Sequence, residues 1–323
     1  TFTAENPARL YKELLEIAWE ELIDFTGYFS VTSTVDNETI TTPLFANLKV
    51  KDAIVDRIKE KKEIRPNTGP EANKAVIHLY WKENDAEIFI DTSGETLAKH
   101  GYRKIPGKAP MLEALAAGTI MATGWDKKSP FVVPMCGSGT LAIEAALLAC
   151  DKTPGLFRMN YSFMHILGYE EEVFFTERRK LKDQAKKEID FRIVATDISE
   201  DAIDISIKNA RTAGVDHLID FSVCDFADTE VPEGSGVVMF NPEYGERLGV
   251  HSKLEATYKR IGDFMKQKCK GYRGYIFTGN PDLAKKIGLR ADRRIEFYNG
   301  KLDCRLLEYE LYEGSKREPK PTE

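Results

Sequence analysis

The chain has 323 residues, of which 42% are hydrophobic and 30% charged, a composition typical of a folded globular protein and not of a disordered one. At about 150 residues per domain, this length predicts two domains. The 46 basic and 52 acidic residues give a net charge of −6, which argues weakly against a nucleic-acid partner, although a net charge hides local patches. No apolar stretch reaches the roughly 20 residues of a membrane span, so we expect no membrane partner.

The cysteines are five in number and scattered, and none stands in CxxC spacing. This pattern argues against a disulfide framework and against a zinc ribbon. We therefore expect no metal site and a cytoplasmic location, where thiols stay reduced. The first residue is Thr1 and not Met, so we expect a fragment or a processed form.

The first 91 residues are predicted to form a mixed α+β unit. Apolar residues at three- and four-residue spacing predict helices over 7–23 and 51–63, the second of them basic. Strand-like segments are predicted at 28–35, 39–43, 76–82 and 86–91, the last two forming a hairpin. Two prolines and two glycines in 99–110 predict a linker, which we assign to 92–108.

From residue 109 to residue 314 the predicted helices and strands alternate. Helices are expected at 111–123, 140–150, 200–213, 254–268 and 284–287. Strands are expected at 131–134, 192–196, 219–223, 236–240, 274–278, 296–298 and 306–312. This alternation predicts an α/β fold with a mostly parallel, doubly wound, Rossmann-like sheet. Residues 315–323 are predicted to be a disordered tail.

A glycine-rich turn, Pro134-Met-Cys-Gly-Ser-Gly-Thr140, follows the first predicted strand of this region and precedes a helix. Gly137 and Gly139 let the backbone come close to a ligand, and the helix N-terminus offers free N–H groups. No Lys-Ser/Thr pair follows, which excludes a Walker loop. A packing turn explains a lone GxG about as often, but the place after the first strand favours ligand binding.

Two aspartates end the next two predicted strands. Asp197 is placed to accept hydrogen bonds from ribose hydroxyls, although a helix cap is the alternative, a role that Ser199 fills equally well. Asp225 is placed to receive an adenine amino group, with Phe226 packing on the ring. Together with the glycine turn, these residues predict a nucleoside-binding site.

The segment Asn241-Pro-Glu-Tyr244 follows the fourth predicted strand. The Asn241 amide oxygen and the Pro242 carbonyl are two acceptors in one turn, which can grip a planar NH2 group. Tyr244 offers a stacking face for a base extracted from its helix. In isolation an Asn-Pro turn with a core tyrosine is the simpler explanation, and the position downstream of a nucleoside site favours base binding.

These motifs resemble a known family. Residues 133–146 and 240–248, which contain the two turns, look like motifs I and IV of the THUMP-domain RNA methyltransferases. The chain is most similar to bacterial 23S ribosomal RNA guanine-N2 methyltransferases, which were formerly labelled N6-adenine-specific DNA methylases. Segments 93–97, 101–103 and 298–305 resemble further parts of the same family.

The resemblance implies a class I methyltransferase domain at 109–314 and a THUMP-like RNA-binding region at 1–91, which includes a remnant of a ferredoxin-like domain. It implies S-adenosylmethionine as cofactor and transfer of its methyl group to the N2 amine of a guanine in 23S rRNA. Asn241, Pro242 and Tyr244 are then the catalytic residues. The implied cofactor-binding residues are Glu113, Pro134, Cys136, Gly137, Ser138, Gly139, Thr140, Asp197, Ile198, Asp225, Phe226 and Asn241.

Three positions depart from the family pattern. Val133 stands where the family usually has Asp, Leu112 where it has Lys, and Glu243 where it has Pro. The Asn-Pro-X-Tyr motif serves adenine and guanine amino groups alike, so an N6-adenine or tRNA guanine-N2 methyltransferase is one alternative. Val133 and Glu243 support the other, a non-catalytic RNA-binding factor with a decayed cofactor site. The basic segments 49–65 and 99–108 are the candidate phosphate contacts for RNA, with large-subunit rRNA as the expected partner. The sequence leaves the oligomeric state open, with a monomer among the options.

Overall fold

The computed structural model describes residues 1–40, 42–105, 111–244 and 251–312, and the chain divides into two units. The first comprises Thr1–Leu97 and Arg158–Arg179, and the second comprises Ala98–Phe157 and the chain from Lys180 onward. Residues 158–179, which the sequence prediction includes in 109–314, therefore pack with the N-terminal unit. The predicted tail at 315–323 lies outside the described residues.

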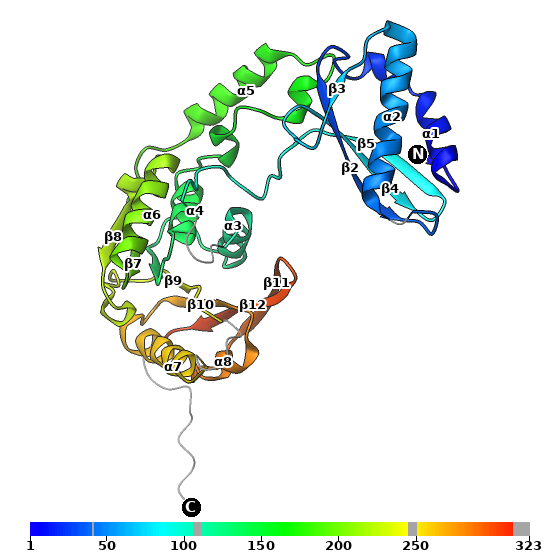
Figure 1. Cartoon of the computed structure of the whole chain (residues 1–323). Coiled ribbons are helices and arrows are strands. Elements are labelled where there is room, and N and C mark those ends of the chain that lie inside the picture. The colour runs from blue at the N-terminus through cyan, green and yellow to red at the C-terminus, as the bar shows by residue number, and fades with distance from the viewer. Residues whose placement is uncertain (41, 106–110, 245–250, 313–323) are drawn as a thin grey trace, which may run out of the picture. The chain divides into compact units, whose positions relative to one another are not determined.

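The first unit is a sheet with the strand order β1-β5-β4-β2-β3, and α1 and α2 pack together with α2 against β2 (Figure 1). In chain order its elements are β1 (Phe2–Thr3), α1 (Pro7–Leu15), β2 (Tyr28–Asp36), α2 (Pro43–Lys62), β3 (Asn67–Thr68), β4 (Ala75–Lys82) and β5 (Asp85–Asp91). Strand β2 runs parallel to β4, and β4 and β5 form the predicted hairpin. Strand β1, helix α1 and strand β2, where the remnant of a ferredoxin-like domain was expected, belong to this same sheet and helix layer.

Two local predictions in this unit are wrong for physical reasons. The helix predicted over 7–23 ends at Leu15, and the buried Trp19 indole donates a hydrogen bond of 2.8 Å to the Leu14 carbonyl. The strand predicted over 39–43 is absent among the described residues of that stretch, because Pro43 begins α2. Proline is preorganised for the first position of a helix, since its missing N–H needs no partner there.

The segment 158–179 is held to the first unit by main-chain and side-chain hydrogen bonds. The Val76 N–H donates to the buried Ser162 hydroxyl at 2.9 Å, and the Phe163 N–H donates to the Thr92 carbonyl at 3.1 Å. The Leu167 N–H donates to the Leu22 carbonyl at 3.0 Å. Helix α5 (Glu171–Gln184), which the sequence analysis does not predict, begins in this segment.

The second unit contains, within the described residues, a seven-stranded sheet in the order β11-β12-β10-β9-β6-β7-β8 (Figure 1). Its strands are β6 (Phe131–Pro134), β7 (Ile193–Asp197), β8 (Ile219–Val223), β9 (Val237–Phe240), β10 (Arg273–Thr278), β11 (Arg293–Asn299) and β12 (Leu302–Glu310). Its helices are α3 (Glu113–Ala122), α4 (Thr140–Ala149), α6 (Glu200–Ala213), α7 (His251–Lys268) and α8 (Pro281–Lys285). Strands β6 to β10 run parallel to one another, and β12 runs antiparallel to both of its neighbours, β10 and β11, which confirms the predicted mostly parallel sheet.

The strand order places a topological switch point between β6 and β9. From β6 the chain moves outward through β7 and β8, and then returns to form β9 on the other side of β6. Ligands of open α/β sheets bind beyond the carboxyl ends of the strands at such a point. Continuing the observed register beyond the strand ends puts Met135, Asp197 and Asn241 at the same level on adjacent strands. The two predicted turns are therefore neighbours in space.

Candidate cofactor and base site

The turn after β6 is built on left-handed backbone conformations. Gly137 and Gly139 have φ values of 58° and 81°. A Cβ at Gly139 would lie 2.9 Å from the Ser206 side chain, so this glycine lets α4 approach α6 closely. A Cβ at Gly137 would meet nothing within 4 Å, and this residue is exposed. Gly139 therefore serves packing, whereas Gly137 leaves the backbone open to a ligand.

The other predicted residues of the turn are buried side chains. They are Pro134, Cys136, Ser138 and Thr140. The Ser206 hydroxyl donates to the Gly137 carbonyl at 2.8 Å, and the Asn209 amide donates to the Ser138 carbonyl at 3.2 Å. Burial raises the pKa of the Cys136 thiol to about 12, so it stays neutral. These side chains shape the turn, and its backbone is the part presented at the surface.

Asp197 ties the turn to the end of β7. Its Oδ2 accepts a hydrogen bond of 3.0 Å from the Gly137 N–H, and its Oδ1 accepts one of 3.0 Å from Ser199. Ser199, not Asp197, caps α6 by accepting from the Ala202 N–H. Each carboxylate oxygen keeps a second lone pair for a hydroxyl donor. The adjacent Ile198 side chain is 72% exposed, so it is free to pack on a ligand.

Asp225 and Phe226 have a partner that the sequence analysis does not identify. The Arg260 guanidinium donates to Asp225 Oδ1 at 2.7 Å and lies 4.8 Å from the centre of the Phe226 ring. Burial raises the pKa of Asp225, but hydrogen bonds from the Ala227 N–H and from Arg260 outweigh it, and the net shift is downward. Phe226 is buried in edge-to-face contact with Phe240. The structure thus places Phe226 in the core beneath Arg260 and not as the open stacking face expected for adenine.

A buried ion pair joins Arg103 to Glu113 at the start of α3. Arg103 Nη2 lies 3.0 Å from Glu113 Oε2, and the two side chains are 10% and 3% exposed. Arg103 Nη1 also donates to the Met111 carbonyl at 2.6 Å and to the Thr140 hydroxyl at 3.3 Å. Oε1 of Glu113 has no hydrogen-bond partner among the residues described. Arg103 therefore links the predicted residue Glu113 to the first residue of α4.

From the sequence alone, Arg103 is expected only as part of a basic linker. The available signal was the segment Gly101-Tyr-Arg103, which belongs to the family resemblance. In the structure the neighbouring Tyr102 hydroxyl donates to the buried Glu144 carboxylate at 2.7 Å, and His100 Nδ1 lies 2.7 Å from the same oxygen. This network anchors the segment on α4, so Arg103 is an internal charge and not a free phosphate contact.

The turn after β9 presents an unsatisfied acceptor. Asn241 Oδ1 is buried and has no hydrogen-bond partner among the described residues. Buried polar atoms in native proteins are almost always paired, so an orphaned amide oxygen marks a place for a donor from a ligand. Pro242 is buried, and Glu243 is exposed. The Asn241 oxygen is the acceptor that the sequence predicts for holding an exocyclic amine.

Tyr244 is half-buried, and its orientation is set by the β11–β12 hairpin. The Asn299 side-chain amide donates to the Tyr244 hydroxyl at 3.1 Å. A Cβ at Gly279 would lie 3.2 Å from the Tyr244 ring, so the absence of a side chain there makes room for it. Asn299 belongs to the segment 298–305 that carried the resemblance, but no role was assigned to it from sequence.

The departures from the family pattern are compatible with an intact site. Val133 is 1% exposed and packs in the core of the second unit, where an apolar side chain needs no partner. Leu112 precedes α3 at the cap position and is 37% exposed. Glu243 is exposed, so its charge is solvated.

The residues fit a zwitterionic nucleoside cofactor. The open Gly137 backbone and the Asp197 lone pairs suit a ribose, and the Arg103–Glu113 pair offers one charge for a carboxylate and one for an ammonium group. Among the described residues, no group of three or more His, Cys, Asp and Glu side chains could hold a metal ion. In that part of the chain, no helix has the length and apolarity needed to cross a membrane.

This protein is a class I S-adenosylmethionine-dependent methyltransferase, a class defined by the order of the strands in the sheet, the glycine turn after the first strand and the acidic residues at the ends of the next two strands. The family model "RMKL-like, methyltransferase domain" matches residues 100–308, and the THUMP domain model matches residues 4–91. The chain belongs to this family of THUMP-containing methyltransferases, and S-adenosylmethionine is its cofactor. The resemblance stated from sequence is confirmed.

Individual relatives agree with this assignment. The chain is 36% identical over 97% of its length to the ribosomal RNA large subunit methyltransferase K/L of Syntrophotalea carbinolica, and 34% identical over 98% to that of Shewanella woodyi. It spans 45% of the length of each of these two proteins. The crystal structure of SMU.472 in complex with SAH superimposes with a TM-score of 0.86 and 27% identity, covering 97% of this chain and 83% of that one.

Proposed function

We propose that this chain transfers the methyl group of S-adenosylmethionine to the exocyclic N2 amine of a guanine in 23S rRNA. The observation that carries the proposal is the orphaned Asn241 Oδ1 at the end of β9. It lies at the level of Asp197 and the glycine turn on adjacent strands, so a base held there sits beside the cofactor site. The names of the K/L relatives support large-subunit rRNA as the substrate. A cytoplasmic location is part of the same proposal.

The cofactor contacts are part of the same proposal. We assign the ribose to Asp197 and the adenine amino group to Asp225 Oδ2, which has no partner among the described residues. The exposed Ile198 side chain is assigned to one face of the base. The methionine end is assigned to Glu113, whose free Oε1 accepts from the ammonium group, and to Arg103 for the carboxylate. The Gly137 backbone lines the path between the two ends.

When bound, the cofactor supplies an electrophilic methyl group on a sulfonium. The lone pair of the guanine amine is delocalised into the ring, so the nitrogen is a poor nucleophile. Asn241 Oδ1 and the Pro242 carbonyl each accept one N–H, which favours a pyramidal nitrogen whose lone pair points away from both acceptors. Tyr244 stacks on the base and holds its plane. Positioning and electrostatics supply most of the rate, and the released proton passes to solvent after transfer.

The Asn241→Ala variant tests this assignment. Loss of one preorganised polar group in an active site costs about 10²- to 10³-fold in kcat. We expect that loss with unchanged cofactor affinity, measured by tritium transfer to protein-free rRNA and by calorimetry. Glu243→Gln, in the same turn but exposed, is the matched control and should transfer at the parent rate. An Asn241→Ala enzyme as fast as the parent would contradict the role of this residue.

Nucleoside digestion of the labelled rRNA identifies the product. Label in N2-methylguanosine supports the proposal. Label in N6-methyladenosine, or label that appears only with tRNA, would show that the proposed substrate is wrong. The proposed cofactor site would stand. An absence of both transfer and cofactor binding would favour the non-catalytic alternative.

A further inference from the structure

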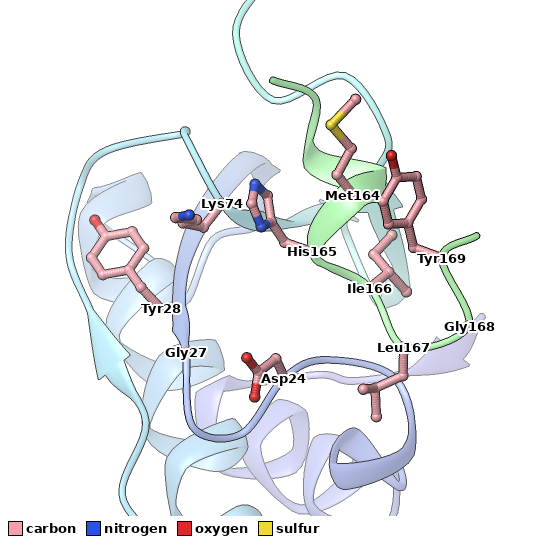
Figure 2. A pocket seen from close by; sticks show the side chains of 10 residues that line it. All are labelled: Asp24, Gly27, Tyr28, Lys74, Met164, His165, Ile166, Leu167, Gly168 and Tyr169. Atoms are coloured by element: carbon pink, nitrogen blue, oxygen red, sulfur yellow. The ribbon is translucent and has the colours of Figure 1, made fainter. Parts of the chain in front are cut away.

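A cavity of about 370 Å³ lies wholly within the first unit, remote in sequence from the residues assigned to catalysis. One wall is the loop before β2 and the other is the segment 164–169, joined where the Leu167 N–H donates to the Leu22 carbonyl at 3.0 Å. Figure 2 shows Tyr28 and Tyr169 at opposite edges of the cavity, with His165, Lys74 and Asp24 between them. The volume falls in the lower part of the range of about 300–1,000 Å³ seen for small-ligand sites.

His165 offers a hydrogen-bond acceptor to this cavity. The Asn160 amide nitrogen donates to the Asn73 carbonyl at 2.7 Å, which leaves Asn160 Oδ1 as an acceptor. That oxygen lies 2.7 Å from His165 Nε2, which must therefore carry the proton. Burial and the nearby Lys74 lower the pKa of His165, so the ring is neutral at physiological pH. Its Nδ1 is then an acceptor, and no described residue donates to it.

Lys74 and Asp24 add one charge of each sign. In the described part of the chain the Lys74 ammonium has no ion-pair partner, and Figure 2 shows it beside His165. Asp24 Oδ1 accepts from the Thr26 hydroxyl at 2.7 Å and from its N–H at 2.9 Å, and these bonds lower the pKa of Asp24. Oδ2 of Asp24 has no hydrogen-bond partner among the described residues. The cavity thus combines one cation, two acceptors without a partner among the described residues, and a tyrosine at each edge.

We infer that this cavity binds one unpaired nucleotide of the RNA, outside the methylated position. Lys74 contacts its phosphate, and the tyrosine rings provide stacking faces for the base. Asp24 accepts from a base amino group, and His165 Nδ1 accepts from the 2′-hydroxyl, which DNA lacks. Stacked, splayed-out bases and 2′-hydroxyl contacts are the usual means of recognising single-stranded RNA. The inference rests on the proposed RNA substrate and adds a second contact point to it.

The residues that line the cavity come from two distant parts of the sequence. Segment 164–169 comes from between α4 and β7 of the methyltransferase sheet, whereas Asp24 and Lys74 belong to the THUMP region. A nucleotide in the cavity therefore contacts both parts of the sequence at once. Its binding would favour the docked position of 158–179 by the free energy of that contact.

The salt dependence of rRNA binding tests the phosphate contact. We expect Lys74→Ala to weaken binding of protein-free 23S rRNA and to lower the slope of log K against log[salt] by about 0.7–0.9, the value of one phosphate contact. The matched control is Lys82→Ala, an exposed lysine at the opposite end of β4, which should change neither quantity. An unchanged slope for Lys74→Ala would overturn the assignment of Lys74.

Two further variants test the base and the sugar. Tyr169→Ala should weaken binding about 5- to 150-fold without changing the salt slope, the usual range for one stacked base. His165→Phe keeps an aromatic ring but removes Nδ1, together with the Nε2 bond to Asn160, so it should reduce the preference for an RNA oligomer over a DNA oligomer of the same sequence. If the parent binds and methylates rRNA while the Lys74 and Tyr169 variants match it, the cavity proposal is wrong and the proposed function stands. If the parent binds no RNA, both fail.

Discussion

Removal of the Arg103 side chain is expected to lower both the stability of the fold and the affinity for the cofactor, and a double variant separates the two effects. The Arg103→Ala variant leaves Glu113, which is 3% exposed, as an unpaired buried carboxylate. It also removes the hydrogen bonds to the Met111 carbonyl and the Thr140 hydroxyl. Breaking a buried ion pair in this way costs about 3–5 kcal/mol. That is a large part of the about 5–15 kcal/mol that stabilises a typical domain.

The same substitution should weaken binding of the cofactor. A charge-assisted hydrogen bond contributes about 1.5–3 kcal/mol, so we expect affinity for S-adenosylmethionine to fall about 10- to 150-fold. Urea unfolding measures the first effect and calorimetry the second. The double variant Arg103→Met, Glu113→Leu is the control for burial, because apolar replacement of a buried pair is often neutral for stability. It should regain most of the lost stability and none of the affinity.

Two results would refute this reasoning. A loss of less than about 1 kcal/mol in Arg103→Ala would mean that Glu113 is solvated, contrary to its burial. Parent-like cofactor affinity in the double variant would show that the pair only supports the fold.

Two other networks give further predictions. Burial raises the pKa of Glu144, so the folded chain holds the carboxyl proton more tightly than the unfolded chain does. The stability gained from this proton is full below the ordinary pKa of glutamate. It is lost as the pH rises from that value through the raised pKa of the folded state. Glu144→Gln should therefore gain stability relative to the parent over that pH window in urea titrations, whereas Glu144→Ala, which leaves the Tyr102 hydroxyl unpaired, should lose about 1–3 kcal/mol at every pH. Asn299→Ala removes the amide hydrogen bond to the Tyr244 hydroxyl and should lower kcat about five-fold, the equivalent of one neutral hydrogen bond, with an unchanged KM for the cofactor. Tyr244→Phe should match it, and the two changes should not add; additive losses would contradict the link.

Much of the second unit was predictable because its signals are local. A buried strand ending in Pro134, a turn with two glycines and an apolar helix are encoded within 20 consecutive residues. Asn241 follows a strand in the same way. Parallel strands bring such ends to one edge of the sheet, so the order of the motifs along the chain was enough to place them together.

Other features depended on partners far away in the sequence. Charged residues read as a basic run are indistinguishable by composition whether they are solvated or paired, and only the fold shows that Arg260 lies on Asp225, 35 residues away. For the same reason, the sequence did not show that Arg260 covers the Phe226 ring, which was predicted to pack on adenine. Likewise, Asn299 reaches Tyr244 across 55 residues of sequence.

The sequence by itself determined the two-part organisation, the family, and the turns that carry the candidate chemistry, because backbone conformation and burial period are properties of short segments. The tertiary structure decided which polar groups pair with each other and which keep no partner among the described residues. It paired Arg103 with Glu113, left Asn241 Oδ1 without a partner among the described residues, and docked Ser162 on Val76, 86 residues earlier. Pairing and burial of polar groups depend on the simultaneous packing of distant segments, and no local pattern encodes them.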